Sequence, residues 1–279
     1  MRFPAFLALF FLALFSIPAF ASQLNVVSPV QQTLVLPEHV LDLGVIGPGQ
    51  TVEVVAERGS GVIAAESQTK GEALWDQLFV VRESLPAGWK AEDSKLFENP
   101  FHAFITASPA AGDGEYAFQL KAFDQYEGAN EKVFSAKVRI SKDLVEQAVA
   151  ENRLVTGVGL PAVIQIKLRN KSSASDVFEL KASGVPSSWA DPRRVFVRFN
   201  SEVEIPFEVL PGEQGEFGVG ITSTSLSSPL INARSGINIQ AVSSLEQDLR
   251  ALNKGLLLFP TVEQVVYSAL SLVSYLVYK

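Results

Sequence analysis

The chain has 279 residues, a net charge of −7, no cysteine and only two histidines. An acidic chain with scattered Lys and Arg has no basic patch for phosphates, so nucleic acid is excluded as the expected partner. The missing thiols exclude cysteine nucleophiles, disulfides and cysteine-bound metals. The length suits about two domains of ~100–150 residues.

The first 21 residues have the composition of a secretory signal peptide. Arg2 precedes an apolar run over 5–15, and an Ala-Phe-Ala triplet ends at Ala21 as a cleavage signature. A membrane-spanning helix needs about 20 apolar residues, and this run is shorter and meets Pro18. We therefore expect residues 1–21 to be removed on export.

From 24 to 243 the chain consists of short alternating or apolar runs separated by Gly, Pro, Asn and Ser. The clearest runs are 51–55, 162–168 and 203–209. Alternation with a period of two is typical of strands with one buried face, so the pattern predicts an all-β chain. The segment 143–154 also contains helix-forming residues, and we interpret it as the first strand of a second domain.

An internal repeat with a period of about one hundred residues runs through this region. Residues 85–89 return as 185–189, and residues 114–120 return as 215–221. Since several unlike features align in one register, we infer that one module has been duplicated.

The repeat sets the expected domain boundaries. The first β-sandwich is expected over 22–142 and the second over 143–244, followed by a linker over 245–254. The first copy is longer than the second, and its extra length falls around 59–75. The expected fold is thus two tandem immunoglobulin/fibronectin-III-like β-sandwiches plus a hydrophobic helix at the C-terminus.

Each copy carries a proline three residues before a tryptophan, at Pro86 and Trp89 and again at Pro186 and Trp189. Proline ends a strand because it cannot donate to the ladder, and the tryptophan can then fold back over the open end of the sandwich. Repetition at one structural position favours two core caps over two ligand-stacking rings.

Three features of the second copy stand together: a strand that closes on Asn170, the proline-to-tryptophan turn, and the Pro-Gly-Glu of 211–213 before an apolar strand. This combination resembles the immunoglobulin-like modules associated with α-galactosidases, which occur in tandem in surface proteins of bacteria and archaea. It covers 155–243 well and 40–141 loosely, since the first copy lacks the asparagine and has 109–113 in place of Pro-Gly-Glu. The resemblance implies an accessory or adhesive role without a transferable active site.

The C-terminal segment 255–279 is mostly apolar. Thr261 and Gln264 form a capping pattern, and a helix over 262–278 would be about 25 Å long, the lower limit for crossing a bilayer. We expect a membrane anchor with Glu263 near the headgroups. A helix lying in the interface and a helix packed on a sandwich remain alternatives.

The sequence offers no motif for catalysis, cofactors or metals. His39 and His102 are not at metal-ligand spacing, and the triplet 59–61 is interpreted as a hairpin turn instead of a nucleophile elbow. We expect no enzyme, no cofactor and no metal. One modification signal exists, because Asn170 begins an Asn-x-Ser triplet and is a candidate for glycosylation.

Two functions follow. The first is a structural or protein-interaction module, exported and anchored at the cell surface through 255–279, with another surface protein as partner. The second is a glycan-binding accessory module, which needs exposed aromatic rings. Its candidate stacking residues are Trp75, Phe101, His102 and Phe104. The alternative for Trp75 is that it packs inward. The sequence names neither the partner nor the oligomeric state.

Overall fold

The computed structural model describes residues 22–36, 39–64, 71–125, 129–243 and Ser268. The expected signal peptide and linker lie outside the described residues, and so does the expected anchor apart from Ser268. Within the described ranges, no helix is long and apolar enough to cross a membrane.

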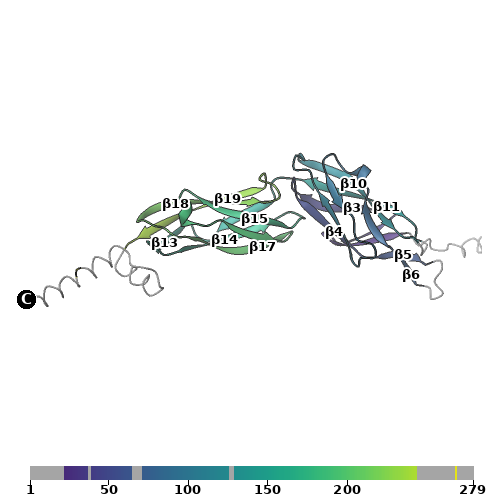
Figure 1. Ribbon diagram of the computed structural model, residues 1–279, viewed down its shortest axis with the longest axis horizontal. Coiled ribbons are helices and arrows are strands. Elements are labelled where there is room, and N and C mark those ends of the chain that lie inside the picture. Colours follow the sequence, from purple (N-terminus) through teal and green to yellow (C-terminus); the bar gives the residue numbers. More distant parts are fainter. Residues whose placement is uncertain (1–21, 37–38, 65–70, 126–128, 244–267, 269–279) are drawn as a thin grey trace, which may run out of the picture.

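Two β-sandwiches follow one another along the long axis of the molecule (Figure 1). The chain is all-β, as the alternating runs predicted. Each sandwich has its own hydrophobic core, one built around rings such as Phe101 and Phe134 and the other around Phe178 and Phe207.

The first sandwich consists of two facing sheets and a small hairpin. One sheet has the strand order β2 (Gln32–Val35), β1 (Gln23–Ser28), β4 (Thr51–Ala56), β9 (Phe101–Thr106) and β8 (Lys90–Glu92). The other has the order β3 (Val40–Ile46), β11 (Lys132–Ile140), β10 (Gly114–Phe123) and β7 (Gln77–Val80). The hairpin pairs β5 (Gly59–Ile63) with β6 (Glu72–Leu74). Residues 59–61 therefore begin a strand, which corrects their interpretation as a turn.

The second sandwich repeats this plan with fewer strands. One sheet has the order β12 (Val145–Val149), β14 (Ala162–Asn170) and β17 (Ser201–Val209). The other has the order β13 (Arg153–Gly157), β19 (Asn232–Val242), β18 (Gly215–Ser225), β15 (Asp176–Ser183) and β16 (Arg193–Val197). The segment 143–154, which also contains helix-forming residues, thus supplies β12, the first strand of the second domain, and the first two residues of β13.

Alternating side chains create the two cores. In β14 every second side chain from Ala162 to Asn170 is buried, and those between them face solvent. This is the pattern of a strand with one face on a core and the other in water.

Strand order identifies the sandwiches as immunoglobulin-like. In each module the edge strand β3 or β13 runs parallel to the last strand, β11 or β19, while the other pairs of the two sandwiches are antiparallel. Without the edge strands β2 and β3, the order β1-β4-β9-β8 opposite β7-β10-β11 is the four-on-three arrangement of constant-type immunoglobulin domains.

Besides the additional strands β2, β5 and β6 of the first module, the two modules differ in the pairing of one strand. β8 pairs with β9, whereas its counterpart β16 pairs with β15 in the opposite sheet. β17 consequently forms the edge of its sheet.

Candidate functional site: the junction between the sandwiches

The junction is formed by the turn 47–50, which joins β3 to β4 and contacts the second sandwich. Gly49 has a φ of 75°, in the left-handed region that favours glycine. A Cβ at Gly49 would lie 2.5 Å from the carbonyl oxygen of Ser227. Both the backbone conformation and the close approach of the second sandwich therefore require glycine.

Gln50 is a polar side chain that the junction buries completely. Its amide nitrogen donates to Oδ2 of Asp176 at 2.6 Å. Its Oε1 accepts from the hydroxyl of Ser172 at 2.7 Å and from the backbone N–H of Gly47 at 2.8 Å. Because buried polar groups are costly when unpaired, these bonds favour the relative position of the two sandwiches in which they form.

Asp176 is the centre of this network, with 4% of the residue exposed. Besides Gln50, its carboxylate accepts from the hydroxyls of Ser225 at 2.6 Å and Ser227 at 2.9 Å, and from the N–H of Val177 at 2.7 Å. Neutral donors thus replace the water that a carboxylate loses on burial.

The end of β3 adds a second set of contacts across the junction. The N–H of Ser173 donates to the carbonyl of Val45 at 2.7 Å, and the N–H of Val45 donates to the Ser173 hydroxyl at 3.2 Å. A Cβ at Gly47 would lie 2.2 Å from Cδ1 of Ile231. Apolar packing therefore accompanies the hydrogen bonds.

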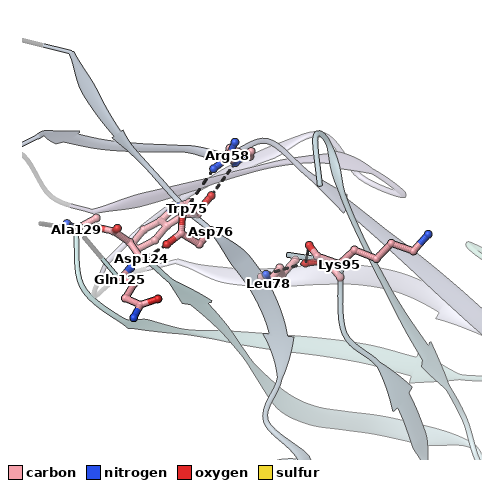
Figure 2. Close-up of polar contacts among 9 residues, drawn as sticks. Arg58, Trp75, Asp76, Leu78, Lys95, Asp124, Gln125 and Ala129 are labelled. Atoms are coloured by element: carbon pink, nitrogen blue, oxygen red, sulfur yellow. Dashed lines mark hydrogen bonds and ion pairs between the residues drawn. The ribbon is translucent and has the colours of Figure 1, made fainter. Parts of the chain in front are cut away.

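Asp76, whose surroundings Figure 2 shows, is the counterpart of Asp176 in the register of the repeat. Each aspartate lies just before or at the start of the equivalent strand, β7 or β15. Asp76 is 6% exposed, pairs with the guanidinium of Arg58 at 3.7 Å and accepts from the N–H of Gln125 at 2.9 Å. In the first module, Arg58 of the same module pairs with this aspartate. In the second module, the equivalent aspartate accepts from Gln50 of the first module.

Trp75 lies beside this closed end and is fully buried. Its indole N–H donates to the carbonyl of Gln23 at 3.0 Å. Its own carbonyl accepts from Nε of Arg58 at 2.8 Å (Figure 2). No ring face is left for a sugar. Trp75 therefore packs inward as a core residue, and its candidacy as a stacking platform is corrected.

The other three stacking candidates do not gather around Trp75. Phe101 is fully buried in the core. His102 and Phe104 alternate with the inward residues of β9 and are partly exposed on its outer face. Nδ1 of His102 lies 2.6 Å from Oε1 of Glu53. The sheet therefore separates the four residues onto two faces.

Asn170 is fully buried at the end of β14. Its Nδ2, the atom that would carry a glycan, donates to the carbonyls of Ala174 at 2.9 Å and of Val197 and Arg198 at 3.3 Å. Its Oδ1 accepts from the N–H of Ser172 at 3.0 Å. The folded chain therefore encloses the glycosylation candidate, and Asn170 fixes the corner that precedes the junction.

The two tryptophans of the repeat occupy equivalent positions. Trp89 is 8% and Trp189 is 9% exposed. The backbone N–H of Trp89 donates to the carbonyl of Pro86 at 3.1 Å, and the backbone N–H of Trp189 donates to the carbonyl of Pro186 at 3.0 Å. Their rings contact aligned aromatic residues, with centroid distances of 5.4 Å to Tyr116 and 4.8 Å to Phe217. Each tryptophan covers one end of its core.

Within the described residues, no group of three or more His, Cys, Asp or Glu side chains could hold a metal ion. The junction residues Gln50 and Asp176 were missed by sequence reasoning. A signal existed, because Asp76 and Asp176 stand in the same register as the two tryptophans.

No protein-family model and no curated protein matches the chain. Among solved structures it is similar to the ASH / PapD-like domain of human CEP192 (PapD-like domain 7), with 14% identity and a TM-score of 0.28, over 37% of this chain and 88% of that chain. It is also similar to a chimeric titin Z1Z2 functionalised with a KLER exogenous peptide from decorin, with 12% identity and a TM-score of 0.36, over 80% of this chain and 99% of that chain. The α-galactosidase-associated type stays a prediction.

Proposed function

We propose that the protein is an exported, membrane-anchored cell-surface protein whose two sandwiches form a rigid spacer for interaction with another surface protein. The buried hydrogen bond between Gln50 and Asp176 carries this proposal. A spacer needs a fixed angle between its modules, and a buried polar network fixes one because its donors and acceptors have no alternative partners in water.

The connecting segment supports rigidity because it is bonded to both sandwiches. Ser141 donates its N–H to Ile46 at 3.0 Å, and Lys171 donates its N–H to Leu144 at 2.8 Å. Nζ of Lys171 also lies 3.2 Å from carboxylate oxygens of both Asp143 and Glu146. Burial lowers the pKa of Lys171, but its hydrogen bonds to these two carboxylates outweigh burial and raise it.

The direction of the last strand supports anchoring at the far end. β19 begins just after Ile231, which packs at the junction, and ends at Val242. A strand of eleven residues is about 35 Å long. The chain therefore leaves the second sandwich at the end opposite the junction, which would present the first sandwich away from the membrane.

Deletion of residues 255–279 tests the anchor. We expect the full-length protein to stay with membranes through high-salt and alkaline washes, and the truncated protein to move to the soluble fraction. A control truncation that removes 1–21 alone tests export by protease accessibility from outside the cell. Retention of the 255–279 deletion in washed membranes would contradict the anchor.

A further inference from the structure

The second sandwich lacks a strand beside β17 in the place where the first sandwich has β8 beside β9. In the first, the residues after Trp89 form β8, where Lys90 stands opposite Thr106 and Glu92 opposite Phe104 of β9. In the second, Pro192 stands three residues after Trp189, the place that Glu92 has after Trp89. Because proline cannot donate to a ladder, the chain continues to β15 as β16 and leaves β17 uncovered.

A groove of about 630 Å³ lies where this strand is missing. The segment after Trp189 forms one wall, and Phe207, Glu208 and Leu210 belong to the other. Its volume falls within the range of about 300–1,000 Å³ that is common for binding pockets. The walls combine apolar side chains with the carboxylates of Asp191 and Glu208.

The backbone of β17 faces this groove, and the hydrogen-bonding groups of Glu208 there are unused. Pro206 stands opposite Gln165 of β14 and has no N–H, so even-numbered residues of β17 point their backbone groups away from β14. Two contacts agree with this: the guanidinium of Arg193 donates to the carbonyl of Pro206, and the N–H of Leu210 donates to the carbonyl of Trp189 at 2.6 Å. In the described part of the chain, no contact occupies the outward N–H and C=O of Glu208.

We propose that this edge of β17 binds an extended segment of a partner protein, which adds to the sheet as a strand and carries Lys or Arg at alternate positions. The first module supplies the geometry, because β8 fills this place beside β9. Charge selects the sequence of the partner. Glu202 pairs with Lys167 at 2.7 Å and Glu204 stands opposite Lys167, whereas Glu208 stands opposite Val163 and no described residue forms an ion pair with it. By the register of the repeat, Phe104 of β9 aligns with Glu208 of β17, so a basic side chain in the position of Glu92 would face Glu208.

The same charges disfavour a second copy of this chain as the occupant. Two antiparallel β17 strands would bring the glutamates of one copy against those of the other, and like charges across strands are destabilising. Addition of a strand to a sheet edge is an established mode of peptide recognition, in which backbone bonds supply affinity and side-chain pockets supply specificity. The inference rests on the proposed role as an interaction protein and does not require the membrane anchor.

Fluorescence polarisation with labelled peptides tests the proposal on the full-length protein in detergent. The probe is Ser-Lys-Val-Lys-Val-Lys-Ser, and the control peptide replaces each Lys with Glu. We expect the basic peptide to bind at least about tenfold more tightly, because charge-assisted contacts across a strand pair add to the ladder bonds. A third peptide has the charges of the probe but N-methylated amides on one edge, and it should lose binding because it cannot join the ladder.

Three variants locate the binding site. Glu208→Lys should weaken binding of the basic peptide about tenfold, whereas Glu83→Lys, an exposed site of the first module with the same charge change, should leave it unaltered. Arg193→Ala frees the carbonyl of Pro206 and should strengthen binding about fivefold. Circular dichroism of each variant verifies folding.

Equal binding of the basic and N-methylated peptides would overturn strand addition. Equal binding by wild type and Glu208→Lys would overturn the location at β17. Membrane fractionation is unaffected by either result, so failure of this inference and failure of the anchor are separate outcomes.

Discussion

Asp176 has the same place in the repeat as Asp76 but a different partner. Arg58 of the first module satisfies Asp76, while Asp176 accepts from hydroxyls of its own module and from the amide of Gln50. The cation Arg58 satisfies Asp76 from within its own module, whereas the neutral amide of Gln50 reaches Asp176 from the neighbouring module. The end of the second module that carries Asp176 is therefore the end that contacts the first module.

Asp176→Ala should lower the free energy of unfolding by about 3 kcal/mol, because it removes several charge-assisted bonds and leaves Gln50 and two serines without an acceptor. Urea unfolding followed by tryptophan fluorescence measures this loss. Asp191→Ala, an exposed aspartate of the same module, should change stability by less than about 0.5 kcal/mol. Equal effects of the two variants would mean that the junction network does not stabilise the fold.

Asn170→Ala should cost about 2–3 kcal/mol, since three carbonyls lose the donor that holds this corner. Asn232→Ala removes a single exposed bond to Pro229 and should be nearly neutral. Mass spectrometry of the wild-type protein produced through a glycosylating secretory pathway should find Asn170 unmodified. A glycan on Asn170 would contradict its burial.

At the level of strands, alternation and the repeat predicted most of the architecture. The runs 51–55, 162–168 and 203–209 are β4, β14 and β17, because each buries one side-chain face. The hairpin β5–β6 and the change of sheet by β16 were not predicted. They depend on which neighbour a short strand meets, and local periodicity contains no information on pairing.

The candidate site was less predictable than the fold for a related reason. Composition alone makes Trp75 and Phe101 candidates for ligand stacking, yet both are fully buried and supply core volume, which for Trp75 is the alternative of inward packing. Gln50 looked like an ordinary turn residue, since a buried amide is recognisable only when its partner Asp176, distant in the sequence, is known. The conserved register of Asp76 and Asp176 within the repeat was the available signal.

The equivalent positions of Trp89 and Trp189 predict similar losses of stability when either one is replaced. Trp89→Ala and Trp189→Ala should each lower the free energy of unfolding by about 3 kcal/mol, because each leaves a cavity next to an aligned aromatic residue. Replacement by Phe should cost less in both modules. Chemical unfolding of the four variants is the measurement, and a loss below about 1 kcal/mol for either alanine variant would refute the cap.

On the scale of the whole molecule, the turn that docks the first sandwich has a counterpart at the free end of the second. There the repeat places Leu160 where Gln50 stands, and the first sandwich closes its own aspartate with Arg58. A further copy of the chain therefore could not repeat the Gln50–Asp176 contact, because Leu160 replaces the glutamine at one free end and Arg58 already pairs with the aspartate at the other. This favours a spacer of two modules over an open chain of copies.

Backbone ¹⁵N relaxation on residues 22–254 tests the rigid junction most directly, with wild type compared with Gln50→Ala. We predict one rotational correlation time for both wild-type sandwiches, and two shorter, separate values once Gln50 is removed. Two separate values already in the wild-type protein would contradict the rigid spacer.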